Sequence, residues 1–224
     1  MNRKKRRRIK RIVLNLLFLL IIAGGGVIAL LFFKKTRPLP ESFIPGEYST
    51  AADISAEAAS KGQDWLNAAY MGEEADMASV LGELELTLKL NMSPDGSYSI
   101  TLDEESVKKA EERAQAALAD AFCDLAVLRL KAAGEGDYDR ESARARTEDK
   151  LGMSLTEYMK DYGPDMVRDA AELKAEYERS GSWEVKEGVL YMDGQPLSSF
   201  AASEAIFVYD PGNGAAVKVW KRIK

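Results

Sequence analysis

Alternation of apolar and polar residues gives the clearest secondary-structure signal in the chain. Leucine occupies every second position from 84 to 90, and Tyr98, Ile100 and Leu102 repeat this spacing after a short polar stretch. A period of two places successive side chains on opposite faces of a strand, so each strand buries one face. The Ser-Pro-Asp-Gly sequence at 93–96 is typical of a tight turn. The pattern predicts a β-hairpin.

Helical spacing dominates the middle of the chain. Apolar positions recur every three or four residues in 55–71 and again in 103–133, which predicts two amphipathic helices. Asp103 stands where it can cap the second helix. Residues 137–180 predict shorter helices, and Ser-Leu-Thr-Glu at 154–157 is a capping-box pattern.

Strand patterns return at the carboxyl end, and one precedes the first helix. Predicted strands begin at Gly46, cover the alternating residues around Trp183 and Val185, and follow at 189–192, 206–209 and 215–223. Strands therefore open and close the domain while helices fill its middle, with the helical part at about 103–180. The expected fold class is α+β with an antiparallel sheet.

A long apolar run sets the expected location of the protein. Residues 12–33 carry no charge and would span about 33 Å as a helix, enough to cross a bilayer. The basic stub 1–11 precedes this run, so the positive-inside rule keeps the amino terminus cytoplasmic. The proline-containing residues 34–45 then form a linker to an extracytoplasmic domain, 46–224. The alternative is a cleaved signal peptide, but the run is longer than the apolar part of such peptides.

Charge is divided unevenly between these parts. The chain has 31 basic and 36 acidic residues, and 11 of the basic ones lie in 1–37, where there is no acid. The remainder has 20 basic residues against 36 acidic ones, a net charge of −16. Such a domain repels phosphates, so nucleic acid is excluded as a partner, whereas the basic stub suits anionic lipid. Gly25 and Ala29 would allow close helix packing in the membrane, which leaves a homo-oligomer open.

The sequence motif Gly-x-aromatic at the start of predicted strands suggests a family resemblance. It occurs at Gly46-Glu47-Tyr48, at Gly96-Ser97-Tyr98 and at Gly181-Ser182-Trp183, where a hairpin with Asp193-Gly194 follows. This resembles the Gly-x-Trp strand of lipocalin-like domains in membrane-anchored Gram-positive envelope proteins. The resemblance implies a partial barrel that carries a helical insertion and holds a small apolar ligand. The ligand-binding residues it implies are Tyr98, Ile100, Leu102, Trp183 and Val185.

Few residues suggest catalysis. The chain has no histidine and one cysteine, so Ser-His and Cys-His nucleophile pairs and intrachain disulfides are ruled out. Ser106 and Lys109 match Ser-x-x-Lys, but the partner motifs of acylating enzymes are missing. Cys123 lies beside an apolar stripe and is expected to be a packed side chain.

One acidic segment has the spacing of a calcium loop. Asp137, Asp139, Glu141 and Glu148 fall at its ligand positions, yet Ser142 stands where the loop needs glycine. A solvated, charged helix is the simpler interpretation. We therefore expect neither a metal, nor a cofactor, nor a catalytic residue.

These features favour a non-enzymatic, single-pass envelope protein whose acidic domain binds a protein partner or an envelope component. Trp220 is expected to be exposed, opposite Val219, and so to mark a partner surface. The alternative is a lipocalin-like carrier or sensor of a small apolar ligand. A hydrolase that uses carboxylates alone is a third hypothesis, for which no acidic pair stands out.

Overall fold

The structure is a computed structural model, and it describes residues 43–187, 189–196, 205–208 and 218–223. The predicted basic stub and membrane span lie outside these residues, as does most of the predicted linker. Within them, no helix combines the length and the apolar character needed to cross a bilayer.

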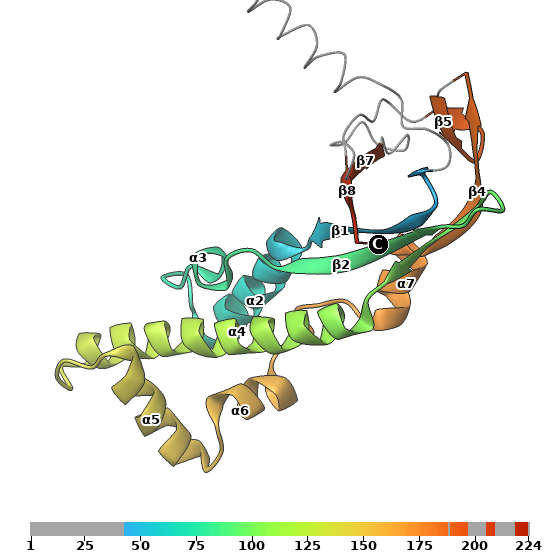
Figure 1. Cartoon of the computed structure of the whole chain (residues 1–224). Helices are drawn as coiled ribbons and strands as arrows, with labels where there is room; N and C mark the ends of the chain where they lie inside the picture. The colour runs from blue at the N-terminus through green and yellow to red at the C-terminus, as the bar shows by residue number, and fades with distance from the viewer. Residues whose placement is uncertain (1–42, 188, 197–204, 209–217, 224) are drawn as a thin grey trace, which may run out of the picture.

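The described part of the chain mixes helices with one antiparallel sheet. The sheet order is β6-β5-β4-β3-β2-β1-β8-β7, and Figure 1 shows it curled into a half-barrel. The strands are β1 (Gly46–Asp53), β2 (Glu85–Met92), β3 (Ser97–Leu102), β4 (Arg179–Lys186), β5 (Val189–Met192), β6 (Gln195–Pro196), β7 (Ala205–Val208) and β8 (Lys218–Arg222). The helices are α2 (Ser55–Tyr70), α3 (Met77–Leu81), α4 (Glu104–Ala132), α5 (Arg140–Leu151), α6 (Leu155–Tyr162) and α7 (Ala170–Tyr177).

The predicted hairpin and the principal helices are confirmed. In β2 and β3 the alternating apolar residues are buried and pair in register, Leu90 opposite Ile100 and Met92 opposite Tyr98. Gly96 has a φ of 83°, which the turn between them requires and a side chain would strain. The capping box at Ser154 is also present at the start of α6.

Two local features differ from the expectation. Asp103 precedes α4, but its side chain accepts no capping hydrogen bond and instead forms an ion pair with Lys89 at 3.1 Å. The backbone carbonyl of Asp103 accepts a hydrogen bond from the Ser106 hydroxyl instead. The five-residue helix α3 was not predicted, because it is too short to show a helical period.

The amino-terminal side of the domain begins before β1. Tyr48 donates a hydrogen bond to the carbonyl of Ile44 at 2.6 Å, and Ile44 is buried. Arg222 of β8 lies over the Tyr48 ring and donates to the carbonyls of Phe43 and Pro45. Residues 43–45, assigned to the linker from sequence, are therefore packed against the domain.

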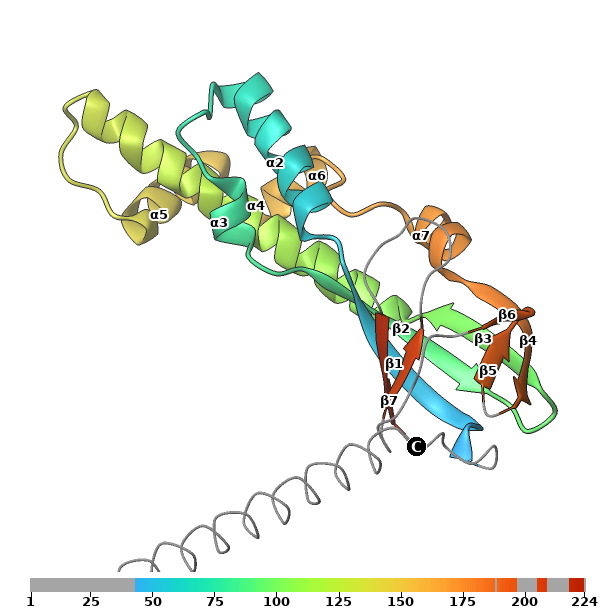
Figure 2. The same ribbon diagram turned by 90° about the horizontal axis from the view of Figure 1, so that it is seen from above.

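The helices extend from one end of the sheet. β1 runs into α2 and β3 runs into α4, so both helices leave the sheet at the same end (Figures 1 and 2). The buried stripe of α4, from Val107 to Leu125, packs against α2, α3 and α6. The sheet and the helical part share one apolar core among the described residues.

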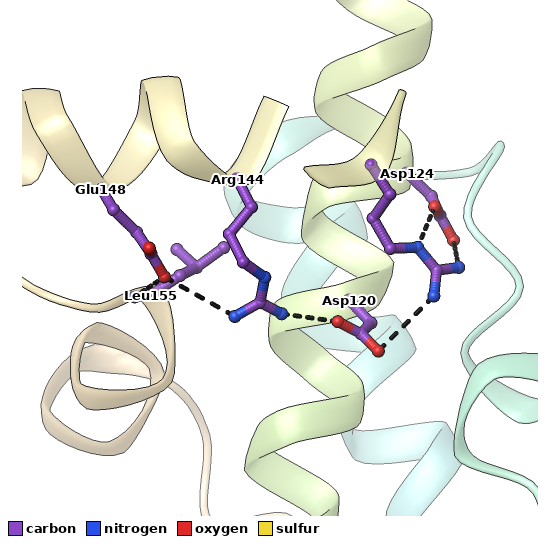
Figure 3. A network of polar contacts seen from close by, with 6 residues as sticks. Asp120, Asp124, Arg144, Glu148 and Leu155 are labelled. Atoms are coloured by element: carbon purple, nitrogen blue, oxygen red, sulfur yellow. Dashed lines mark hydrogen bonds and ion pairs between the residues drawn. The ribbon is translucent and has the colours of Figure 1, made fainter. Parts of the chain in front are cut away.

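Helix α5 is held mainly by charge. Of its side chains only Ala143 is buried. Arg140 binds both carboxylate oxygens of Asp124, at 2.7 and 2.5 Å, and Arg144 reaches Asp120 at 2.5 Å (Figure 3). Glu148 links this network to α6 by accepting the backbone N–H of Leu155.

The thiol of Cys123 lies beneath this network. Its side chain is completely buried on α4, and burial raises the pKa of the thiol to about 11. The thiol is therefore protonated at neutral pH and shielded from reagents. Cys123 is the only cysteine of the chain, so its reactivity reports on the local opening of α5.

We predict that loosening the ion pairs of α5 exposes Cys123. Replacing both arginines (Arg140→Gln, Arg144→Gln) should raise the rate of thiol labelling by an aromatic disulfide about fivefold at 0.1 M salt. Exposed ion pairs contribute a few tenths of a kcal/mol to about 1 kcal/mol each. The unsubstituted protein should approach the same rate at 1 M salt, because the screening length falls from about 10 Å to about 3 Å.

The matched control is Lys174→Gln, which removes the ion pair of α7 with Glu104 at the other end of α4. It should leave the labelling rate unchanged. Equal rates for the double variant and the unsubstituted protein would show that apolar packing, and not charge, holds α5.

Candidate functional site

The five residues implied by the lipocalin-like resemblance lie on one face of the sheet. Tyr98 pairs with Gly181, and Trp183 and Val185 follow Gly181 at every second position of β4. Ile100 and Leu102 share this face with Tyr98. The buried residues Tyr48 and Leu90 pair along the same face, which we call the inner face of the curled sheet. The five residues thus share a face, and their role in binding a ligand stays a prediction.

Their polar atoms are engaged within the protein. The Tyr98 hydroxyl donates to Asp193 Oδ2 at 2.6 Å, and the Trp183 indole N–H donates to the carbonyl of Ser93 at 3.0 Å. Four of the five side chains are at most 6% exposed, and Val185 is half-buried. In this arrangement the five residues offer apolar contact alone.

Asp193 is a key residue of this face that the sequence showed only as part of a turn. It takes the left-handed conformation, with a φ of 50°, in the turn between β5 and β6. Its carboxylate accepts the Tyr98 hydroxyl and also the backbone N–H of Ser182 at 2.9 Å. A Cβ at Gly181 would lie 2.1 Å from Asp193 Oδ1, so only glycine leaves room for the carboxylate. We call Tyr98, Gly181, Ser182 and Asp193 the aspartate clasp.

The aspartate clasp shifts both of its titrating groups. The hydrogen bond from Tyr98 lowers the pKa of Asp193, with help from the Ser182 backbone. Burial, and then the hydrogen bond to Asp193, raise the pKa of Tyr98 to about 12. Both shifts favour the ionised aspartate beside the neutral phenol.

The expectation that Trp220 is exposed is wrong. Its side chain is 2% exposed, whereas that of Val219 is 37% exposed. Trp220 and Val219 do lie on different faces of β8, as predicted. However, β8 pairs with β1 so that Arg222 is the partner of Tyr48, which places Arg222 on the inner face. Trp220 shares that face, and the predicted partner surface loses its basis. Its indole N–H has no hydrogen-bond partner among the residues that the structure describes.

The other sequence candidates have structural roles. The Ser106 hydroxyl accepts the backbone N–H of Thr87 at 2.9 Å, and Lys109 pairs with Glu105. Asp139 caps α5, and Glu148 binds Arg144 and Leu155. No group of three or more acidic or cysteine side chains among the described residues is placed to hold a metal ion.

An aromatic strip, which sequence reasoning missed, joins α2, α4 and α6. Its members are Trp65, Tyr70, Phe122, Tyr158 and Tyr162. Tyr70 meets Trp65 and Phe122 edge to face, with ring centroids 5.2 and 4.8 Å apart, and its hydroxyl lies 3.5 Å from that of Tyr158. The rings of Tyr158 and Tyr162 are 5.0 Å apart.

The outer end of the aromatic strip faces solvent. Tyr162 is 62% exposed, and Met71, which follows Tyr70, is 78% exposed. Of the eight large hydrophobic side chains that are exposed in the described part of the chain, five belong to the helices and their loops. These five are Met71, Leu128, Leu151, Met153 and Tyr162. No sequence period could reveal the aromatic strip, because its members come from three helices that are distant along the chain.

We predict that Gly181→Ala lowers the free energy of unfolding by about 2 kcal/mol. The new methyl group displaces the Asp193 carboxylate and leaves the Tyr98 hydroxyl and the Ser182 N–H without their acceptor. Urea unfolding measures the change. Ser182→Ala alters an exposed neighbouring side chain and should have little effect. If the two variants are equally stable, the aspartate clasp contributes nothing.

The contribution of Asp193 should also depend on pH, and Asp193→Asn isolates it. Because its folded pKa is lowered, this contribution is present above the unfolded value of about 3.9 and is lost as the pH falls through the folded pKa. The contribution of Tyr98 is present below about 10 and is lost as the pH rises toward about 12. The stability difference between the unsubstituted protein and Asp193→Asn should therefore be largest near neutral pH.

Comparison with known proteins adds no identity to this geometry. No protein-family model, no curated protein and no solved structure matches the chain. The lipocalin-like resemblance accordingly stays a prediction from the sequence, and what the structure itself supplies is a curled antiparallel half-barrel with a helical extension.

Proposed function

We propose that the chain is a non-enzymatic, single-pass envelope protein whose acidic extracytoplasmic domain binds a protein partner. The anchor and its orientation rest on the apolar run 12–33 and the basic stub before it. The single structural observation that supports partner binding is the exposed end of the aromatic strip. Tyrosine, tryptophan and methionine are enriched in protein interfaces, where their large apolar area is buried on association.

The position of the aromatic strip suits this role. The linker joins the domain beside Gly46, at the start of β1, and the helices leave from the other end of that strand. The eight residues of β1 separate the two ends by about 26 Å. A domain tethered through this linker can therefore hold its helical part away from the bilayer, within reach of another envelope protein.

A second function, a carrier of a small apolar ligand, is favoured by one observation. The indole N–H of Trp220 is buried on the inner face of the sheet, and no described residue accepts a hydrogen bond from it. Buried donors are nearly always paired in native proteins. An apolar ligand with a carbonyl or carboxylate acceptor would satisfy this donor.

We expect a photoreactive phenylalanine analogue at Tyr162 to cross-link the full-length protein, in its own membrane, to a second polypeptide. The analogue fits because the Tyr162 side chain is largely exposed. The same analogue at Ile223, an exposed position that follows β8, is the control and should give little product. Equal yields of one adduct at both positions, or no adduct at Tyr162, would contradict the proposal.

Native mass spectrometry of the full chain, released from detergent, tests the carrier function. A retained small molecule that is lost in Trp220→Phe, which removes the indole N–H and keeps an aromatic ring, would support that function. A mass equal to that of the polypeptide alone would leave the partner-binding proposal as the better one.

A further inference from the structure

Along the chain, acidic residues flank several members of the aromatic strip. Asp64 precedes Trp65, Glu73 follows Met71 by two residues, and Asp161 and Asp165 stand on either side of Tyr162. All four carboxylates are exposed and form no ion pair with a described residue. Of the cations in this region, Lys61 pairs with Glu57 and Arg129 pairs with Glu74. Lys160, which precedes Asp161, is exposed, and the four carboxylates outnumber it.

Aromatic rings elsewhere in the chain are used to hold cations. Arg146 lies over Tyr138 with its guanidinium carbon 5.3 Å from the ring centroid. Lys186 stands in the same way over Tyr191, and Arg222 over Tyr48. No lysine or arginine of the described residues stands over a ring of the aromatic strip. The aromatic strip thus combines one exposed ring, that of Tyr162, with flanking carboxylates, and no cation of the described residues stands over it.

We propose that the aromatic strip binds a cationic, partly apolar segment of the partner protein, with arginine or lysine side chains seated against Tyr162 and its acidic border. This inference rests on the proposed function and names the chemistry of the partner. Cation–ring contacts contribute about 0.5–1 kcal/mol each at exposed sites. Carboxylates that border the rings add attraction at long range and orient the approaching segment.

The charge of the domain argues for this occupant. With a net charge of −16 after residue 37, the domain repels anionic polymers and acidic proteins as they approach. Neutral glycan chains can stack on aromatic rings, but the acidic border would then lie unused. A basic segment uses both features of the surface at once.

Synthetic peptides test the proposal on the full chain in nanodiscs of neutral phosphatidylcholine. Three fluorescent nonapeptides share alternating leucines and differ in the other positions, which carry arginine, glutamine or glutamate. Fluorescence anisotropy should show the arginine peptide binding at least tenfold more tightly than the glutamine peptide, and its affinity should fall with salt. The glutamate peptide should not bind.

Substitutions locate the binding. Tyr162→Ala should weaken the arginine peptide about fivefold to tenfold, and the pair Asp161→Asn with Asp165→Asn should weaken it by a similar factor at low salt. The matched control is Glu111→Gln with Glu112→Gln, which removes two exposed, unpaired carboxylates from α4. The control should keep the affinity within about twofold.

Three outcomes would overturn the inference. These are equal affinity for the arginine and glutamine peptides, an equal loss in the control variant, and binding of soluble peptidoglycan fragments through Tyr162 without binding of the arginine peptide. Cross-linking at Tyr162 remains informative in each case. An adduct there, together with failure of the arginine peptide, would keep the partner-binding function and discard only the cationic segment.

Discussion

The curl of the sheet is imposed by a short connection between its two edges. β6 and β7 are the edge strands, and only residues 197–204 lie between Pro196 and Ala205. In a flat sheet, seven strand spacings would separate these edges by about 34 Å. Nine Cα–Cα steps reach at most about 32 Å. The sheet must therefore curl, and the curl turns the alternating leucines, tyrosines and tryptophans toward a common interior.

The two halves of the molecule are stabilised differently. On the inner face of the sheet, ordered polar contacts such as the aspartate clasp satisfy the few hydrogen-bonding atoms among large apolar side chains. The outer helix α5 is joined to α4 by ion pairs and has Ala143 as its only buried side chain, whereas α6 buries Leu155 and Met159 in the core. Charge therefore matters most for α5, while α6, which contributes Tyr158 and Tyr162 to the aromatic strip, is held by apolar packing.

Features within a few residues of one another could be predicted from the sequence. The hairpin of β2 and β3, helix α4 and the capping box at Ser154 all follow from local periods and turn residues. Features that depend on distant pairing could not. Which side of β8 is buried depends on its pairing with β1, far away along the chain, so Trp220 was placed on the wrong side.

The same distinction explains what was missed in the candidate sites. The sequence indicates only a turn at Asp193, because its hydrogen-bond partner Tyr98 lies 95 residues earlier. The aromatic strip draws on α2, α4 and α6, none of which shows an unusual aromatic period by itself. Of the residues with calcium-loop spacing, Asp139 caps α5 and Glu148 accepts the backbone N–H of Leu155, which the spacing alone did not reveal.

The edge strand β6 has a consequence for behaviour at high surface density. It is two residues long and includes Pro196, which has no amide hydrogen to offer an incoming strand. If the proposed anchor confines the protein to a membrane, its molecules meet far more often than in solution, and unprotected sheet edges would then pair into fibres. A proline at this border keeps crowded neighbours from such polymerisation along β6.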